Sequence, residues 1–190
     1  PPPAWAYPVN PPDFKPVPDD GTLRRVPGSN VGYTLSQARD RFLAPDWHPA
    51  DQPPMPEVVA RGRKPDVYAC SYCHRAGGPG GPENAPIAGL PVAYILQQMA
   101  DFKSGARRSS VPQRAPVMLK ATLAKAITDD ELLTAARHFA ALIPQRTVRV
   151  VETERVPRTQ VAGWVLTPAP GSETESMAGR IIEVPDDLHQ

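Results

Sequence analysis

One apolar stripe predicts a helix from Pro91 to Lys103. Apolar side chains recur there at three- and four-residue steps, which is the period of a helix with one buried face. Gly105 follows, as is typical where a helix ends. The stripe comprises Val92, Ile95, Leu96, Met99 and Phe102.

A second long helix is predicted to begin at Thr128. Glu131 stands three residues further on, so the two side chains can satisfy each other's backbone donors in a capping box. Pro144 ends this helix because it has no N–H to donate. The expected buried face comprises Leu132, Leu133, Ala136, Phe139, Ala140 and Ile143.

Only short helices are predicted ahead of these two. One covers residues 35–42, another opens with Pro56 and runs to Ala60, and a third is a short turn over 67–74. The Gly- and Pro-rich segment 76–89 is predicted to be an irregular loop. Beyond Pro144, β-branched or apolar runs at 147–152, 161–166 and 180–184 predict a small sheet or hairpin. Because a lone hairpin is marginal in water, we expect it to pack on the helical unit or on a partner.

Prolines set the character of the first third of the chain. The sequence holds 26 prolines, fourteen of them up to Pro56, and each fixes φ and removes a backbone donor. Residues 1–55 are therefore predicted to form an extended arm that wraps the core, with a disordered tail as the alternative. Scattered aromatic residues give the arm something to bury: Trp5, Tyr7, Tyr33 and Trp47. The expected domains are the arm (1–55), a compact helical unit (56–144) and a β-rich extension (145–190).

Charge and hydropathy exclude several function classes. A formal net charge of +1 provides no strong field for nucleic acid or an anionic membrane. No apolar run approaches the roughly 18–20 residues that span a bilayer. The first residues lack a basic start followed by an apolar stretch, so we expect either a mature chain whose leader has been removed or a chain that had none.

The candidate chemistry lies at Cys70-Ser-Tyr-Cys73-His74. Two cysteines are too few for a disulfide framework or for a zinc site with about four ligands, and no βαβ pattern precedes Cys70 as it would in a thioredoxin-type dithiol. Cys-x-x-Cys-His is a haem attachment signature. Thiols one helical turn apart can add to the two haem vinyl groups, and the next imidazole then projects at the iron. One covalent haem c is predicted on Cys70, Cys73 and His74.

From Cys70 to about Ile143 the chain resembles the class I cytochromes c, closest to periplasmic mono- and di-haem members. The likeness rests on the haem motif and on the stretches 87–105 and 123–142. It implies a mainly α, class I cytochrome c helical fold, here with a Pro-rich N-terminal arm and a small C-terminal β extension. Because thioether attachment takes place outside the bacterial cytoplasm, it also implies a periplasmic location.

The resemblance further implies individual site residues. In the family a methionine ahead of the last helix binds the iron opposite the histidine; Met118 matches, in a segment predicted to be irregular, although relatives often place this methionine a residue or two nearer the helix. His48 is the rival sixth ligand. A proline carbonyl that holds the ring of the ligating histidine corresponds to Pro86. Tyr94 and Arg107 are expected near the haem propionates.

A six-coordinate, covalent haem leaves no open site for a substrate, so one-electron transfer is predicted rather than enzymatic catalysis. The expected partners are a donor dehydrogenase or respiratory complex and an acceptor oxidase or cytochrome, met through small transient contacts. Two alternatives remain open. One is an electron-transfer subunit fixed in a larger dehydrogenase or respiratory complex. The other is a haem enzyme or gas sensor with an open sixth position.

Overall fold

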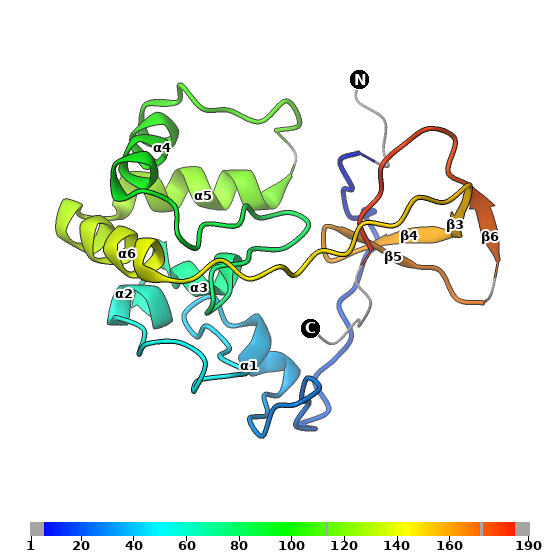
Figure 1. The fold of residues 1–190 in the computed structure, drawn as a ribbon, viewed down its shortest axis with the longest axis horizontal. Coiled ribbons are helices and arrows are strands. Elements are labelled where there is room, and N and C mark those ends of the chain that lie inside the picture. Colours follow the sequence, from blue (N-terminus) through cyan, green and yellow to red (C-terminus); the bar gives the residue numbers. More distant parts are fainter. Residues whose placement is uncertain (1–5, 113, 172, 185–190) are drawn as a thin grey trace.

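The computed structural model describes residues 6–112, 114–171 and 173–184. The longest helices in the described part of the chain are α4 (Val92–Ser104), α5 (Ala115–Ala126) and α6 (Asp129–Ala141). Figure 1 shows them gathered at one end of the molecule, where α4 packs on both α5 and α6. Together with the residues that directly follow α5 and α6, they supply most of the buried residues of the hydrophobic core.

Both long helices predicted from the pattern are present. α4 ends at Gly105, which adopts the left-handed conformation (φ 79°) that glycine enters without steric cost. α6 is opened by Thr128, whose side chain accepts from the Glu131 N–H while the Glu131 carboxylate accepts from the Thr128 N–H at 2.9 Å. The capping box is therefore confirmed.

Short elements lead the chain into the Cys70–His74 motif. α1 (Leu35–Arg39) and α2 (Glu57–Ala60) are followed by an antiparallel pair, β1 (Gly62–Arg63) and β2 (Val67–Tyr68), and then by α3 (Cys70–His74). The first two residues of the helix predicted over 67–74 are thus strand, and the helix is confined to Cys70–His74. Gly62 makes the hairpin possible, because a Cβ on it would lie 2.1 Å from the Val67 carbonyl oxygen.

One hydrophobic core joins these pieces. It draws residues from α2, β2, α4, α5 and α6 and from the segments just beyond α5 and α6, and Val59, Val67 and Phe139 are at most 1% exposed. Its buried members are Val58, Val59, Val67, Met99, Leu123, Ala124, Ile127, Ala135, Phe139 and Leu142.

The strands beyond residue 144 differ from the prediction. β3 (Arg155–Pro157) pairs with β6 (Thr174–Ser176), and β4 (Thr159–Ala162) pairs with β5 (Val165–Pro168). The run 161–166 is divided by a turn at Gly163 and Trp164, both with positive φ. No strand forms over 147–152 or 180–184, where Val150 and Ile181 are each 87% exposed. Without a neighbour to cover them, β-branched residues alone do not make a strand.

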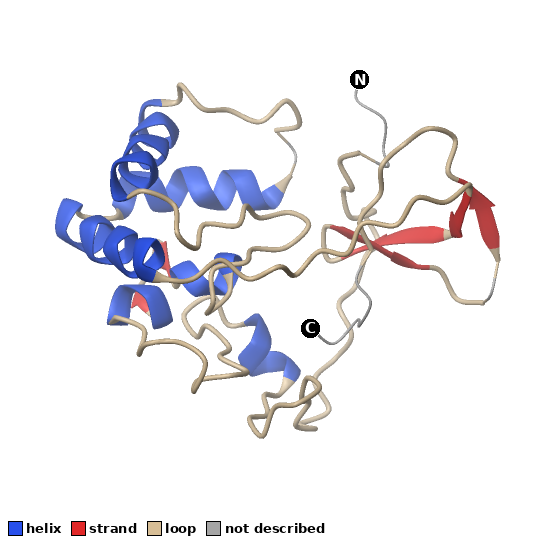
Figure 2. Ribbon diagram, in the orientation of Figure 1, coloured by secondary structure: helices blue, strands red, loops and turns tan. Residues whose placement is uncertain are grey.

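The predicted fold class is wrong. Helix makes up only 29% and strand only 12% of the structure, in six short helices and short strand pairs within the described ranges, and a class I cytochrome c helical fold is not what forms. Figure 2 shows long irregular segments between the elements. The reason is local: Pro and Gly recur between the helices, and each proline removes a hydrogen bond that a longer helix would need.

The N-terminal segment touches both ends of the molecule. The Ala69 N–H donates to the Arg41 carbonyl and the Ala44 N–H to the Ala60 carbonyl, each at 2.9 Å, so residues 41–44 brace the entry to α3. At the other end, Figure 1 shows the blue segment beside β4 and β5, where the Trp164 N–H donates to Asn10 Oδ1 at 3.1 Å. These contacts fit an extended arm, while the division into three domains stays a prediction.

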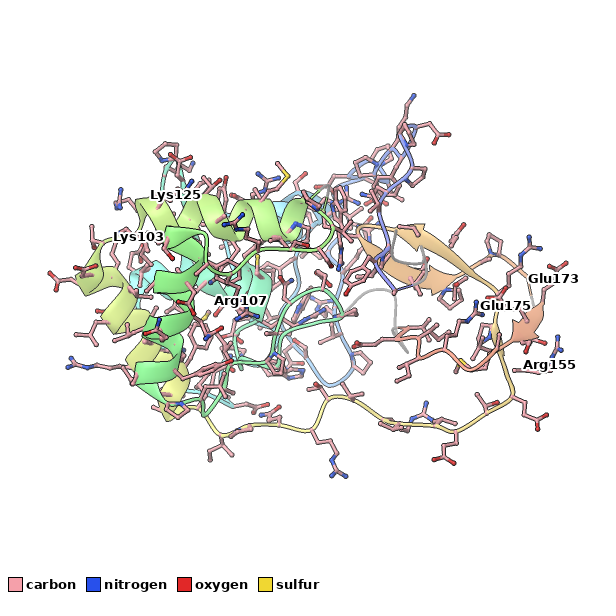
Figure 3. The ribbon with its side chains drawn as sticks, turned by 90° about the horizontal axis from the view of Figure 1, so that it is seen from above. Lys103, Arg107, Lys125, Arg155, Glu173 and Glu175 are labelled. Atoms are coloured by element: carbon pink, nitrogen blue, oxygen red, sulfur yellow. The ribbon has the colours of Figure 1, made fainter. Side chains whose placement is uncertain are left out.

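Charged groups lie at both ends of the structure. Figure 3 shows Lys103, Arg107 and Lys125 at the helical end and Arg155, Glu173 and Glu175 at the strand end. Among the described residues, no helix combines the length and apolar character needed to cross a membrane.

Candidate functional site

α3 presents two thiols on one side of a single turn. Cys70 and Cys73 are three residues apart, close to the 3.6 residues of a helical turn, and both are free and half-buried. Ser71 between them is only 1% exposed and anchors the opposite side. The Cys70 thiol lies 3.5 Å from the Val58 carbonyl oxygen. Burial raises the pKa of Cys70 to about 11 and also raises that of Cys73, so both sulfurs carry their protons at neutral pH.

The imidazole of His74 is held in one orientation. Its Nδ1 lies 2.9 Å from the Ala85 carbonyl oxygen, and because a carbonyl only accepts, Nδ1 carries the proton. Nε2 is then left with its lone pair. Burial, helped by the positive charge of Lys120, lowers the pKa of His74 to about 3. The ring is therefore neutral and ready to act as a ligand.

The residue that holds the ring is one position away from the prediction. The carbonyl belongs to Ala85, and Pro86 is the exposed residue that follows it. The hydrogen-bond partner of His74 lies in the predicted loop, but it is the carbonyl of Ala85 and not that of Pro86. Pro86 still contributes to the geometry, because a proline biases the preceding residue towards an extended backbone.

Gly80 brings the loop back to His74. Its N–H donates to the His74 carbonyl at 3.0 Å, and its own carbonyl accepts from Arg75 Nε at 2.9 Å. Gly80 has φ 72°, and a Cβ on it would lie 2.3 Å from the Asn84 oxygen and 2.7 Å from the Ala85 oxygen. Only glycine lets the two backbones approach so closely.

Aromatic rings of α6 lie beside the imidazole of the motif. The Phe139 ring, 1% exposed, lies edge-on to His74 with 6.2 Å between ring centroids. Next to it, the His138 ring meets Phe139 at 5.4 Å. α6 therefore supplies the wall against which the imidazole rests.

Met118 does not lie where the sequence placed it. It is part of α5, a regular helix that was not predicted, and its side chain is 59% exposed. Pro116 near the helix start was the available signal for α5, since proline is favoured in the first turn. His48 is exposed in the N-terminal arm beside Gly28.

The two predicted propionate contacts are on α4 and just after it. Tyr94 is 49% exposed. Arg107 stacks over the Phe102 ring at 4.9 Å and bonds the Gln98 side-chain oxygen. Of the two, Arg107 has an electrostatic link to the motif: its charge helps to lower the pKa of Lys120, which in turn acts on His74.

Lys120 is the residue that sequence reasoning missed. It sits on α5, and its charge influences Cys70, Cys73 and His74 together. Burial is the main cause that lowers its own pKa. In the sequence, Lys120 lies three, four and seven residues before Leu123, Ala124 and Ile127. This spacing places Lys120 on the same helix face as these apolar residues.

Across the described ranges, no group of three or more His, Cys, Asp or Glu residues is arranged to hold a metal ion. Two protonated thiols and one oriented imidazole suit a group that is bound covalently through sulfur and coordinated once through nitrogen.

Comparison with known proteins gives one partial likeness. The chain is 30% identical over 82 residues to the thiosulfate dehydrogenase electron acceptor of Thiomonas intermedia (strain K12). The match covers 42% of this chain and 34% of that protein, so the chain spans about a third of its length. No family model matches. No solved structure matches either. The likeness is consistent with a role in electron transfer.

Proposed function

We propose that this protein is a one-electron carrier that holds one covalent haem c through Cys70, Cys73 and His74. The observation that carries the proposal is the hydrogen bond from His74 Nδ1 to the Ala85 carbonyl. It leaves Nε2 unprotonated, next to two thiols on the same helical turn, and a carbonyl partner of this kind is what orients histidine ligands in metal sites.

The residues of α3 would bind the group as follows. Each thiol would add across one vinyl double bond, with sulfur bonding to one carbon and the thiol hydrogen going to the other, so that no net oxidation is needed. His74 Nε2 would supply the nitrogen ligand, and the Ala85 carbonyl and the Phe139 ring hold the imidazole in its orientation. When bound, haem supplies an iron that changes its charge by one, and the protein tunes that change through ligands and burial.

The partial relative points to the class of partner. Its name describes an electron acceptor for a dehydrogenase, and by this likeness we propose a dehydrogenase as the electron donor. Because haem attachment to thiols takes place outside the bacterial cytoplasm, we place the protein in the periplasm.

The direct test is the haem itself. We expect the protein, expressed with a haem-attachment system, to have the mass of the polypeptide plus one haem and to resist thiol alkylation. Its pyridine-treated spectrum should be that of a haem with two thioether bonds. Cys70→Ser and Cys73→Ser should each lose one bond, and the double variant should lose covalent haem. A polypeptide of bare mass with two alkylated cysteines would refute the proposal.

A matched pair of histidine variants tests the ligand. His74→Gln should retain covalent haem but lose the low-spin spectrum, because the imidazole is removed while the thiols remain. His48→Gln, at an exposed position in the arm, should leave the spectrum unchanged. If His48→Gln instead removed the low-spin spectrum, the arm would supply a ligand.

The alternative of a subunit fixed in a larger dehydrogenase complex is favoured by the same relative, since an electron acceptor works with a dehydrogenase. Size-exclusion chromatography of the native periplasmic extract separates the two. Elution of the haem absorbance at the size of the isolated chain supports a free carrier, and co-elution with thiosulfate-oxidising or other dehydrogenase activity supports a subunit.

A further inference from the structure

The two faces of α5 differ sharply in exposure. Met118, Thr122 and Lys125 follow one another at steps of four and three and are all exposed. Lys120 is half-buried and lies three, four and seven residues before the buried Leu123, Ala124 and Ile127. Because each residue turns the helix by about 100°, Met118 and Lys120 point in directions about 200° apart.

The inner face of α5 is the one that meets the haem motif. α5 packs against β2, the strand that runs directly into Cys70. The positive charge of Lys120 helps to lower the pKa of His74 and opposes the rise in pKa of both thiols. Lys120 shares its helix face with the buried Leu123, Ala124 and Ile127, and α5 packs against β2, which ends two residues before Cys70. The side chain of Lys120 is therefore directed towards the start of α3.

Lys120 has no partner that explains its position. Within the part of the chain that the structure describes, neither a hydrogen bond nor an ion pair is formed by its amine. The nearby charge of Arg107 has the same sign. Burying a cation without a counter-ion is costly. The position of Lys120 would therefore be explained by a bound group to which its amine nitrogen donates its lone pair.

We propose that Lys120 Nζ, rather than Met118 Sγ, is the sixth ligand of the haem iron, an inference that rests on the proposed function. On binding, the ammonium gives its proton to solvent and the amine lone pair forms the bond to iron; no electron is transferred. Met118 would reach the same side only if α5 unwound or turned by about half a revolution.

The chemical consequence is a different redox range. A thioether stabilises ferrous iron and raises the potential. An amine is a harder donor that favours the ferric state, so the carrier would work at a lower potential than a methionine-ligated one. This would suit a carrier that passes electrons onward to higher-potential acceptors.

Spectroscopy of the haem-loaded protein tests the inference. The oxidised protein should lack the far-red methionine–iron charge-transfer band, and the reduced protein should lack a strongly upfield-shifted methionine methyl resonance in its proton spectrum. Lys120→Met should create both signals and raise the potential. Met118→Leu should alter neither, and Lys125→Met, on the exposed face of the same helix, is the matched control and should match the unmodified protein.

Two results would overturn the ligand assignment alone. One is a far-red band in the unmodified protein that Met118→Leu removes. The other is a Lys120→Met spectrum and potential identical to those of the unmodified protein. Both leave covalent haem in place. A chain of bare mass, in contrast, would refute the proposed function and this inference with it. The methyl resonance is read on the unmodified protein, so the result does not depend on whether a variant folds.

Discussion

Gly80 allows the backbone that carries the Ala85 carbonyl to approach His74 closely. A side chain at this position would meet the Asn84 and Ala85 oxygens at 2.3 and 2.7 Å. Gly80→Ala should therefore push the Ala85 carbonyl away from His74 and lower the yield of haem-loaded protein. It should lower the free energy of unfolding by more than the about 1 kcal/mol that a strained positive φ costs. Thermal unfolding and haem content measure both effects.

Gly105 provides the control for this variant. It also has a positive φ of 79°, but a Cβ there would meet nothing within 4 Å. Gly105→Ala should show only the backbone cost and keep full haem content. Equal haem loss in both variants would contradict the role given to the Gly80 approach.

His138 is a buried imidazole with an unused nitrogen. It is 9% exposed, its Nε2 has no hydrogen-bond partner in the described structure, and burial lowers its pKa below the ordinary 6.5. The unfolded chain then binds the proton more readily than the folded one, so stability falls as the pH drops below about 6.5.

His138→Phe should reduce this pH dependence. We expect a gain of about 1 kcal/mol at neutral pH, because an unpaired buried polar atom is removed, and a smaller loss of melting temperature between pH 7.5 and pH 5. Differential scanning calorimetry at the two pH values measures it, with the exposed His48→Gln as control. An unchanged slope with pH would show that His138 does not titrate on unfolding.

At the scale of elements, one ion pair joins three of them. Arg63 of β1 donates to the Glu131 carboxylate through Nε at 2.7 Å and Nη2 at 3.1 Å, and to the Ala126 carbonyl at 3.0 Å. These contacts connect the end of α5 and the start of α6 to the hairpin that precedes the Cys70–His74 motif. The Arg63 contact lowers the pKa of Glu131 to about 2.

The pair should stabilise the fold in a defined pH window. A depressed carboxyl pKa contributes stability that is complete above the ordinary value of 4.5 and is lost as the pH falls towards 2. Glu131→Gln should lower the free energy of unfolding by about 1 kcal/mol at neutral pH, a modest value because Arg63 is half exposed. It should also reduce the loss of that free energy between pH 4.5 and pH 2, measured by urea unfolding at each pH. Glu57→Gln disrupts an exposed pair with Arg61 at 3.9 Å and should change neither the stability at neutral pH nor its decrease at acid pH. An equal effect of Glu57→Gln would mean that surface charge in general sets the stability at acid pH.

At the scale of the whole molecule, a hydrogen bond connects the arm to the hairpin β4–β5. The Trp164 N–H donates to Asn10 Oδ1 at 3.1 Å, and Arg114, ahead of α5, donates to the Trp164 carbonyl at 3.2 Å. Trp164 itself has a positive φ of 72°, which is costly for a large side chain. The contacts from both sides hold it there.

Asn10→Ala should loosen this junction without melting the hairpin. We expect the Trp164 amide to exchange its hydrogen faster, by about fivefold or more for a bond worth about 1 kcal/mol, while the amides of the β4–β5 ladder keep their protection. Hydrogen exchange followed by mass spectrometry or NMR resolves the two sets. Equal acceleration in both would show that the arm supports the whole hairpin.

The sequence pattern predicted the local structure correctly where the interactions that determine it join residues only a few positions apart. The capping box at Thr128, the left-handed end of α4 at Gly105 and the stripe of α4 follow from neighbours three or four positions apart. The same holds for the Cys70–His74 motif, whose thiols are brought together by one turn of helix. These features are visible in the sequence because backbone geometry alone relates the residues concerned.

Only the tertiary structure decided the rest, because the deciding partners are far apart in the chain. It made 67–68 a strand against β1, left the β-branched run 147–152 uncovered, and placed Ala85 rather than Pro86 on the imidazole. It also turned Met118 outwards and Lys120 inwards, since the packing of α5 on α4 and β2 selects which helix face is buried. A sequence lists both side chains as neighbours; the fold determines which of them can reach the site.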